Sequence, residues 1–213
     1  MSSRPTGRSV KISEDERTGW SSDRPRREGA PQRPADLTVH NSVLRPADRL
    51  RYSPGSLLIV SCASQEDLDA FLSRLIEERA AVLSLRKVRE LLAGRVPEEA
   101  LQERAGELLL AAVQKRLEAR QTVVLATEGF TPEEREPFIR AAAAQRRPRH
   151  LILIETARER VTDEDLPALN ELRRALDAGE LGNEGIQTSL RLGGGSAAEV
   201  KRILFRPPPR EEE

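Results

Sequence analysis

Residues 57–69 read Leu57-Leu-Ile-Val-Ser-Cys-Ala-Ser-Gln-Glu-Asp-Leu-Asp69, and they indicate how this chain of 213 residues folds. The apolar run Leu57–Val60 follows the turn signal Pro54-Gly55, which predicts a buried strand. A helix is expected from Glu66 to Arg79, because apolar residues recur there on one helical face. A buried strand that leads directly into an amphipathic helix is typical of the βαβ unit of a parallel sheet.

The same alternation continues along the chain. Further strands are expected at residues 81–85, 122–127, 150–155 and 200–205, and further helices at residues 87–93, 98–120, 131–146 and 163–178. Residues 179–199 have the weakest pattern. Strands that alternate with helices predict an α/β protein, a three-layer α/β/α sandwich with a mostly parallel sheet. Ligands of such sheets bind beyond the carboxyl ends of the strands.

Both ends of the chain depart from this pattern. Residues 1–50 are rich in Arg, Pro and Ser and lack apolar periodicity, which predicts a disordered tail. Two apolar patches within it, Leu37–Val39 and Val43–Leu44, could dock onto the domain. Residues 207–213 are expected to form a second disordered tail, since Arg206-Pro-Pro-Pro-Arg-Glu-Glu-Glu213 cannot continue a strand or helix. The domain itself is expected to span residues 53–206.

Composition excludes several classes of function. Lys and Arg balance Asp and Glu at 35 each, so net charge favours neither a dedicated nucleic-acid binder nor an acidic scaffold. Aromatic residues make up 3%, too few for a base-stacking platform. Cys62 is the only cysteine, so no internal disulfide forms, and with His40 and His150 it cannot complete a zinc site. The apolar runs are too short to span a bilayer and the first residues are polar, so we expect a cytoplasmic protein without a membrane partner.

Three stretches carry a resemblance to a known family. The first is Leu83-Ser84 with Arg86-Lys-Val-Arg-Glu-Leu-Leu-Ala-Gly94, the second is Thr122-Val-Val-Leu-Ala-Thr-Glu-Gly-Phe-Thr-Pro-Glu133, and the third is His150-Leu-Ile-Leu-Ile-Glu155 with Arg158 and Arg160. They resemble, in order, the second strand and its helix, the third-strand signature, and the fourth strand with its arginine-bearing lid of small P-loop kinases. The matching type is polynucleotide-kinase-like, or zeta-toxin-like, over about residues 53–206. The resemblance implies a P-loop NTPase-like sheet.

The positions that carry chemistry in that family differ in this chain. A phosphate loop reads G-x-x-x-x-G-K-[ST], in which backbone N–H groups cradle phosphate, Lys neutralises it and the hydroxyl binds Mg²⁺. The aligned residues are Cys62-Ala-Ser-Gln-Glu-Asp-Leu-Asp69, so both glycines are missing, Leu68 stands for Lys, and Asp69 stands for Ser or Thr. The family's general-base Asp aligns with Arg86, and the Asp and Asn of its third-strand signature align with Ala126 and Gly129. We therefore expect a degenerate loop and no catalytic residues.

Electrostatics strengthen this expectation. Glu66, Asp67 and Asp69 lie in the first turns of the helix whose amino terminus would otherwise attract phosphate. A triphosphate would meet like charge there. Ser64 with Asp67 instead fits a capping box, which predicts a well-capped structural helix at the degenerate loop.

Other residues remain as candidates for binding or reaction. Arg86, Lys87, Arg89, Arg158 and Arg160 could line the carboxyl edge and hold an acidic or phosphorylated partner, although solvated surface charges are the simpler interpretation. Glu128 and Glu155 follow strands but lack companion metal ligands. Cys62 and His150 are expected to be structural. The run Gly193-Gly-Gly195 is expected to be a flexible turn.

The first functional hypothesis is therefore a catalytically inactive P-loop-kinase-like protein that acts as a binding or regulatory module for a protein partner, with no cofactor. One alternative is an atypical kinase or NTPase that binds ATP and Mg²⁺ through the arginine-bearing lid. Another is a polynucleotide-end binder that keeps basic groups on the substrate side but has no catalysis. Binding of a nucleotide would separate the first two hypotheses, and salt-sensitive oligonucleotide binding would identify the third.

Overall fold

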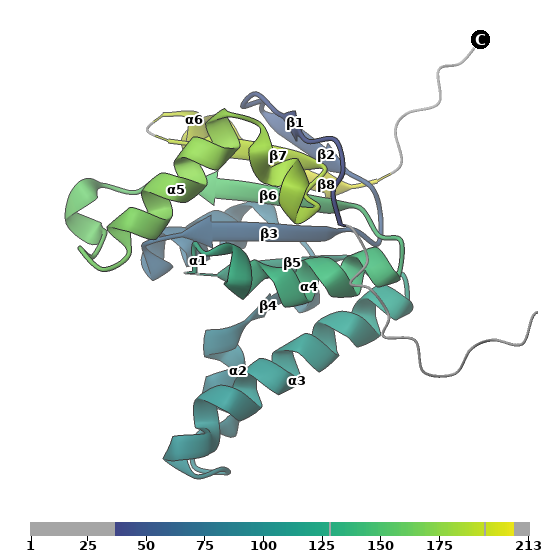
Figure 1. Cartoon of the computed structure of the whole chain (residues 1–213), viewed down its shortest axis with the longest axis vertical. Coiled ribbons are helices and arrows are strands. Elements are labelled where there is room, and N and C mark those ends of the chain that lie inside the picture. Colours follow the sequence, from purple (N-terminus) through teal and green to yellow (C-terminus); the bar gives the residue numbers. More distant parts are fainter. Residues whose placement is uncertain (1–36, 128, 194, 207–213) are drawn as a thin grey trace, which may run out of the picture. The chain divides into compact units, whose positions relative to one another are not determined.

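A six-stranded parallel sheet forms the centre of the described chain (Figure 1). The computed structural model describes residues 37–127, 129–193 and 195–206. The strands of the sheet are β1 (Ser42–Val43), β3 (Leu57–Cys62), β4 (Val82–Ser84), β5 (Val123–Thr127), β6 (Arg149–Ile154) and β7 (Thr188–Leu192). Their order is β1-β7-β6-β3-β5-β4, and each neighbouring pair is parallel.

Helices cover both faces of this sheet. They are α1 (Gln65–Leu75), α2 (Leu85–Leu92), α3 (Glu98–Glu118), α4 (Pro132–Ala144), α5 (Leu166–Asp177) and α6 (Ser196–Glu199), with short 3₁₀ helices at Arg79–Ala81, Arg158–Arg160 and Glu180–Glu184. Apolar residues of α3, α4 and α5 form one core with Leu57 and Ile59 of β3. Those of α1 form the other core with Leu58 and Val60. The predicted three-layer α/β/α sandwich is confirmed.

The α1 side of the sheet also carries a two-stranded parallel ribbon. It consists of β2 (Arg49–Tyr52) and β8 (Arg202–Phe205), and we call it the β2–β8 ribbon. Leu50, Tyr52 and Ile203 of the ribbon belong to the same core as α1. A last strand was expected near residues 200–205, and it forms, but it pairs with β2 and not with the central sheet.

β3 lies in the middle of the sheet because its sequence is apolar on both faces. Its residues Leu57–Val60 are fully inaccessible to solvent. Burial of a Leu, Ile or Val side chain stabilises a fold by about 1.5–3 kcal/mol each. The run that predicts a buried strand therefore fixes the position of the loop that follows it.

The connections that leave β3 and β6 run toward opposite edges of the sheet. From β3 the chain passes through α1 to β4 at one edge, whereas from β6 it passes through α5 to β7 on the opposite side. Adjacent strands whose connections diverge leave a crevice outside their carboxyl ends, and ligands of open α/β sheets bind there. A ligand site is therefore expected at the carboxyl ends of β3 and β6.

The ordered domain begins before the expected boundary at residue 53. β1 and the start of β2 lie within the range expected to be a disordered tail. Val39 N donates to Gly182 O at 2.9 Å, and Leu44 N donates to Ser189 O at 2.7 Å, so the two apolar patches do dock. β2 forms because Arg49-Leu-Arg-Tyr52 alternates exposed and buried residues, the period of a strand. Residues 1–36 and 207–213 lie outside the described residues.

Other element boundaries follow the sequence closely. α1 ends at Leu75 and not at Arg79, because the backbone at Ile76 is extended and leads into a 3₁₀ turn. α4 begins with a complete capping box, in which Thr131 and Glu134 each bind the other's backbone N–H. The segment of weakest pattern, residues 179–199, contains β7.

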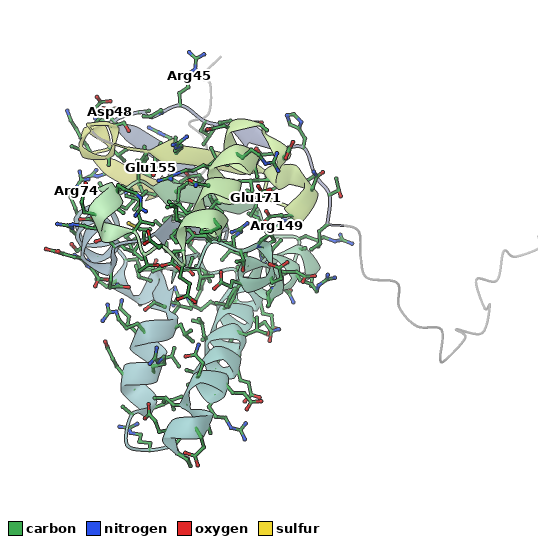
Figure 2. All side chains as sticks on the ribbon, turned by 60° about the vertical axis from the view of Figure 1, so that its left-hand side comes forward. Arg45, Asp48, Arg74, Arg149, Glu155 and Glu171 are labelled. Carbon is green, nitrogen blue, oxygen red and sulfur yellow. The ribbon has the colours of Figure 1, made fainter. Side chains whose placement is uncertain are left out.

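α2 and α3 form a helical hairpin that extends away from the sheet (Figure 2). The turn between them begins at Gly94, whose φ of 71° favours glycine. Among the described helices, none combines the length and the apolar character that crossing a bilayer requires.

Candidate functional site

The connection between β3 and α1 is very short. Only Ala63 and Ser64 separate the end of β3 from the first residue of α1. The Ser64 hydroxyl accepts a hydrogen bond from Asp67 N at 3.3 Å, and the Ser64 carbonyl accepts one from Leu68 N at 3.0 Å. Two backbone donors that could face an anion at a helix amino terminus are thus already satisfied by the protein. The expected Ser64 cap forms, but the Asp67 side chain binds elsewhere.

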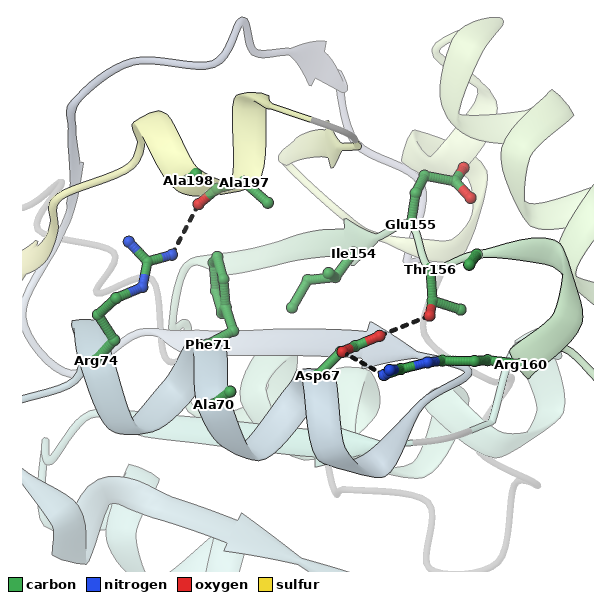
Figure 3. A pocket seen from close by; sticks show the side chains of 11 residues that line it. Asp67, Ala70, Phe71, Arg74, Ile154, Glu155, Thr156, Arg160, Ala197 and Ala198 are labelled. Atoms are coloured by element: carbon green, nitrogen blue, oxygen red, sulfur yellow. Dashed lines mark hydrogen bonds and ion pairs between the residues drawn. The ribbon is translucent and has the colours of Figure 1, made fainter.

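The Asp67 carboxylate is held by two groups from beyond β6. Thr156 Oγ1 donates to Asp67 Oδ2 at 2.6 Å, and Arg160 Nη1 donates to Asp67 Oδ1 at 2.8 Å (Figure 3). Arg160 Nη1 also lies 3.4 Å from Ser64 Oγ and 3.5 Å from Glu66 Oε2. We call the three side chains Asp67, Thr156 and Arg160 the Asp67 tie. It joins the amino terminus of α1 to the segment that follows β6.

Electrostatics favour the charged form of Asp67. The hydrogen bond from Thr156 is the main cause that lowers the pKa of Asp67, with further lowering by the Ser64 hydrogen bond and by Arg160, against a smaller opposing effect of burial. A negative charge in the first turn also interacts favourably with the helix dipole. An internal carboxylate thus supplies the negative charge that a bound phosphate would bring to this helix end.

The other residues that were aligned with a phosphate loop serve the fold. Leu68 is 1% exposed and packs in the core under α1, so it cannot face a ligand. Asp69 Oδ2 accepts from Arg86 Nη2 at 2.8 Å, and Arg86 Nη1 donates to Glu90 Oε1 at 2.6 Å. The residue aligned with the Mg²⁺-binding hydroxyl therefore forms an ion pair with the residue aligned with the general base.

The five basic candidates do not converge on one anion site. Arg160 reaches Asp67 at the amino terminus of α1, and Arg86 reaches Asp69. Arg158 instead pairs with Asp163 at 2.7 Å, within its own loop. Lys87 and Arg89 are exposed on α2. Two of the five thus contribute to the ion pairs around α1, and the others lie apart.

The acidic candidate Glu155 has a structural environment. Arg191 Nε donates to Glu155 Oε1 at 2.7 Å, and Arg173 Nε donates to the same oxygen at 2.9 Å. Burial raises the pKa of Glu155, but the hydrogen bonds from Arg173 and Arg191 outweigh it and leave the pKa below its ordinary value. A carboxylate held by two guanidinium groups is a poor general base. Glu128 lies outside the described residues.

Cys62 and His150 are both buried, as expected. Burial raises the pKa of Cys62 to about 11, so its thiol stays protonated near neutral pH. Burial lowers the pKa of His150 to about 4, and its Nδ1 lies 2.8 Å from Thr188 Oγ1. The backbone of Ser64 and the charges of Asp67 and Arg160 also act on the pKa of Cys62, but burial has the largest effect. Among the described residues, no three His, Cys, Asp or Glu side chains gather into a group that could hold a metal ion.

A cleft of about 900 Å³ opens beside the Asp67 tie, at the crevice that the strand order creates (Figure 3). Its walls are mainly apolar and come from α1, the end of β6 and α6: Ala70, Phe71, Ile154, Ala157, Ala197 and Ala198. Arg74 lies with its guanidinium 5.9 Å from the centre of the Phe71 ring. It also donates to the carbonyls of Val200 at 2.7 Å and Ala197 at 2.8 Å, and so holds the α6 segment over the cleft.

Sequence reasoning did not find this cleft. The apolar face of the first helix is visible in the sequence, but the Ala197–Ala198 wall comes from the segment of weakest pattern. The glycine run was expected to be a flexible turn, and the short helix α6 that follows it was not expected. No protein-family model matches the chain, and a comparison with curated proteins finds no match.

Proposed function

We propose that this protein is a P-loop-kinase-like binding or regulatory module that does not transfer phosphate. The observation that carries the proposal is the Asp67 tie, which places an internal carboxylate and its arginine at the helix end where a kinase of this type would hold phosphate. The two-residue β3–α1 connection leaves little backbone to wrap around a polyphosphate.

The strand order separates this sheet from two other common nucleotide-binding α/β folds. Counted along the chain from β3, the order from β4 to β7 reads 2-3-1-4-5. Dinucleotide-binding sheets have the order 3-2-1-4-5-6, and flavodoxin-like sheets have 2-1-3-4-5. Here β5 and β6, which carry two of the three family-like stretches, flank β3 on its two sides. Their carboxyl ends therefore lie next to the degenerate loop.

The ion pairs argue against phosphate transfer. Such transfer depends on a lysine and a metal ion that neutralise the phosphates and on a residue that orients the nucleophile. The aligned positions hold Leu68, Asp69 and Arg86, of which the first is in the core and the other two bind each other. A protein of this design would act through a surface that recognises a partner.

A nucleotide-dependent stability measurement tests the proposal. ATP with Mg²⁺ at a hundredfold excess over Kd would stabilise a binder by about 2.7 kcal/mol. We expect no shift of the thermal midpoint for this protein, and an active P-loop kinase treated alongside serves as the positive control. A saturable shift that requires Mg²⁺ and the triphosphate would contradict the proposal.

A second candidate function is small-molecule binding in the cleft, including an atypical nucleotide site. The cleft favours it because an apolar hollow with a few polar groups at its rim is the usual form of a ligand site. The Ala70→Trp variant would fill the cleft from the exposed side of α1. If a nucleoside or nucleotide stabilises the natural chain and not this variant, the cleft is the site and the protein is a ligand binder.

Binding of polynucleotide ends is the candidate function with the least support of the three. Arg86, Arg158 and Arg160 each pair with a carboxylate of the protein, so their charge is largely compensated. Binding to phosphate groups would have to compete with these ion pairs. Absence of oligonucleotide binding at low salt would exclude this function.

A further inference from the structure

The outward face of the β2–β8 ribbon carries a concentration of arginine. Along β2, Arg49 and Arg51 are exposed while Leu50 and Tyr52 are buried. Along β8, Arg202 is exposed and Leu204 is partly buried, and Ile203 points into the core. The alternation places Arg49, Arg51, Arg202 and Leu204 on the same face of the ribbon, away from the domain core.

The register brings these side chains close together. Arg49 lies opposite Arg202, and Arg51 lies opposite Leu204. Neighbouring strands are about 4.8 Å apart, and alternate residues on one strand are about 6.6 Å apart. Like charges that face each other across two strands destabilise a sheet. This face therefore has a positive potential that an external anion would relieve.

The protein supplies little negative charge to this face. Residues 45–52 and 199–206 contain six basic residues and only two acidic ones, in a chain whose net charge is zero. The ion pairs that the arginines of this face form with the protein are long. Arg49 lies 3.9 Å from Asp48, Arg202 lies 3.4 Å from Glu77, and all four side chains are more than half exposed. By comparison, the ion pairs at the Asp67 tie and at Arg86 are 2.6–2.8 Å long.

The ribbon also offers a backbone surface. Among the described strands, β2 and β8 pair only with each other, so each has one edge without a strand partner. An extended peptide can add to such an edge through main-chain hydrogen bonds, and its alternate side chains then lie beside the outward residues of the ribbon. The arginine face would select acidic side chains at these alternate positions.

From this face and these edges, we propose that the β2–β8 ribbon binds an extended acidic segment of a partner protein. A peptide fits better than a nucleic acid for two reasons. Leu204 lies among the arginines and gives an apolar contact that a phosphate backbone would not use. The exposed residues of the two strands include no aromatic ring on which a base could stack. This proposal does not depend on whether the β3–α1 connection binds phosphate.

Fluorescence anisotropy with the full chain tests it. The probe is a short labelled peptide in which Glu and Val alternate, and the comparison probes are a peptide in which Lys and Val alternate and a short DNA duplex. We expect the Glu–Val peptide to bind at low salt, to weaken as salt rises, and to bind more tightly than the duplex. The Lys–Val peptide should not bind.

A pair of charge-matched variants locates the surface. Arg49→Glu with Arg51→Glu should weaken Glu–Val peptide binding about tenfold or more, since attraction becomes repulsion at two adjacent positions. Arg95→Glu with Lys115→Glu changes the net charge equally on the α2–α3 hairpin and should leave binding within about twofold. Arg49→Gln with Arg51→Gln, which keeps a polar strand surface, should give an intermediate loss.

Three results would overturn the proposal. The first is that no Glu–Val peptide binds even at low salt, which would leave the arginines as a solvated strand edge. The second is tighter binding of the duplex that is lost in the same β2 variant. The third is an equal loss in the β2 and hairpin variants, which would mean that net charge alone governs binding.

Discussion

Removal of the Asp67 carboxylate should turn the amino terminus of α1 into a weak anion site. In Asp67→Ala, Arg160 and Thr156 lose their acceptor, and the helix end loses a compensating charge. Ser64 remains as the helix cap. A helix amino terminus next to an unpaired guanidinium is the usual setting for a bound phosphate.

The loss of stability can be worked out from the contacts. A hydrogen bond to a charged group contributes about 1.5–3 kcal/mol, an exposed ion pair about 0.2–1 kcal/mol, and a charge at a helix end about 0.3–1 kcal/mol. Side-chain exposures of 36% for Asp67 and 48% for Arg160 reduce all three. We therefore expect a loss of about 1–3 kcal/mol, or a fall in the thermal midpoint of about 3–10 °C for a domain of this size.

Thermal denaturation with increasing inorganic phosphate measures both effects. Phosphate also stabilises proteins by exclusion from their surface, so the natural chain and matched chloride solutions are the references. Glu66→Ala is the control variant, because it removes the same charge from the same turn but lies 3.5 Å from Arg160 and is 84% exposed. Asp67→Ala alone should gain a saturable stabilisation by phosphate. If it loses less than about 0.5 kcal/mol, or gains no more from phosphate than Glu66→Ala does, the tie does not substitute for a phosphate.

Three further predictions concern buried groups. Glu184→Ala should lower the free energy of unfolding in urea by about 3–5 kcal/mol, because it leaves a buried guanidinium without its carboxylate. That guanidinium belongs to Arg135, which is 2% exposed and lies 2.8 Å from Glu184. A loss below about 1 kcal/mol would contradict this. His150 is neutral in the fold and its pKa is lowered from 6.5 to about 4, so the unfolded chain binds the proton first and stability should fall by up to about 3 kcal/mol as pH drops from about 6.5 to 4. His150→Gln should flatten that part of the pH–stability profile, and an unchanged profile would refute the assignment. The Cys62 thiol is fully buried, so it should react with a thiol reagent only as fast as the fold opens to expose it, and urea should accelerate the reaction markedly. Rapid reaction in native buffer would argue against its burial.

The elements that could be predicted from the sequence are those with a strong, single signal. β3 and β6 are continuous apolar runs, and α4 begins with a complete capping box. β7 was missed because three of its five residues, Thr188, Ser189 and Arg191, are polar. Thr188 faces His150, and Arg191 pairs with Glu155, so its polar residues find partners inside the fold. Only tertiary contacts make this strand favourable.

The candidate site was predictable only in part, for an electrostatic reason. The alignment drew attention to residues 62–69, which lie at the carboxyl end of β3 and the start of α1, and Arg160 was expected near the carboxyl edge. With 35 basic and 35 acidic residues, however, local sequence does not tell which arginine pairs with which carboxylate. Arg86 pairs with Asp69 across 17 positions, and Arg160 pairs with Asp67 across 93. Such pairs depend on the strand order.

The distribution of these pairs bears on whether the charges at the start of α1 are matched. Acidic side chains without partners in the first turns of α1 would repel one another. Instead Asp67 and Asp69 each meet an arginine from a different part of the chain, Arg160 behind β6 and Arg86 behind β4. In a double-mutant cycle, replacement of both Asp69 and Arg86 should therefore cost less than the sum of the two single replacements, with a coupling energy of about 0.5 kcal/mol or more. Independent effects at the two positions would mean that the charges are not matched, and the proposal that internal ion pairs occupy the place of a phosphate at α1 would then fail.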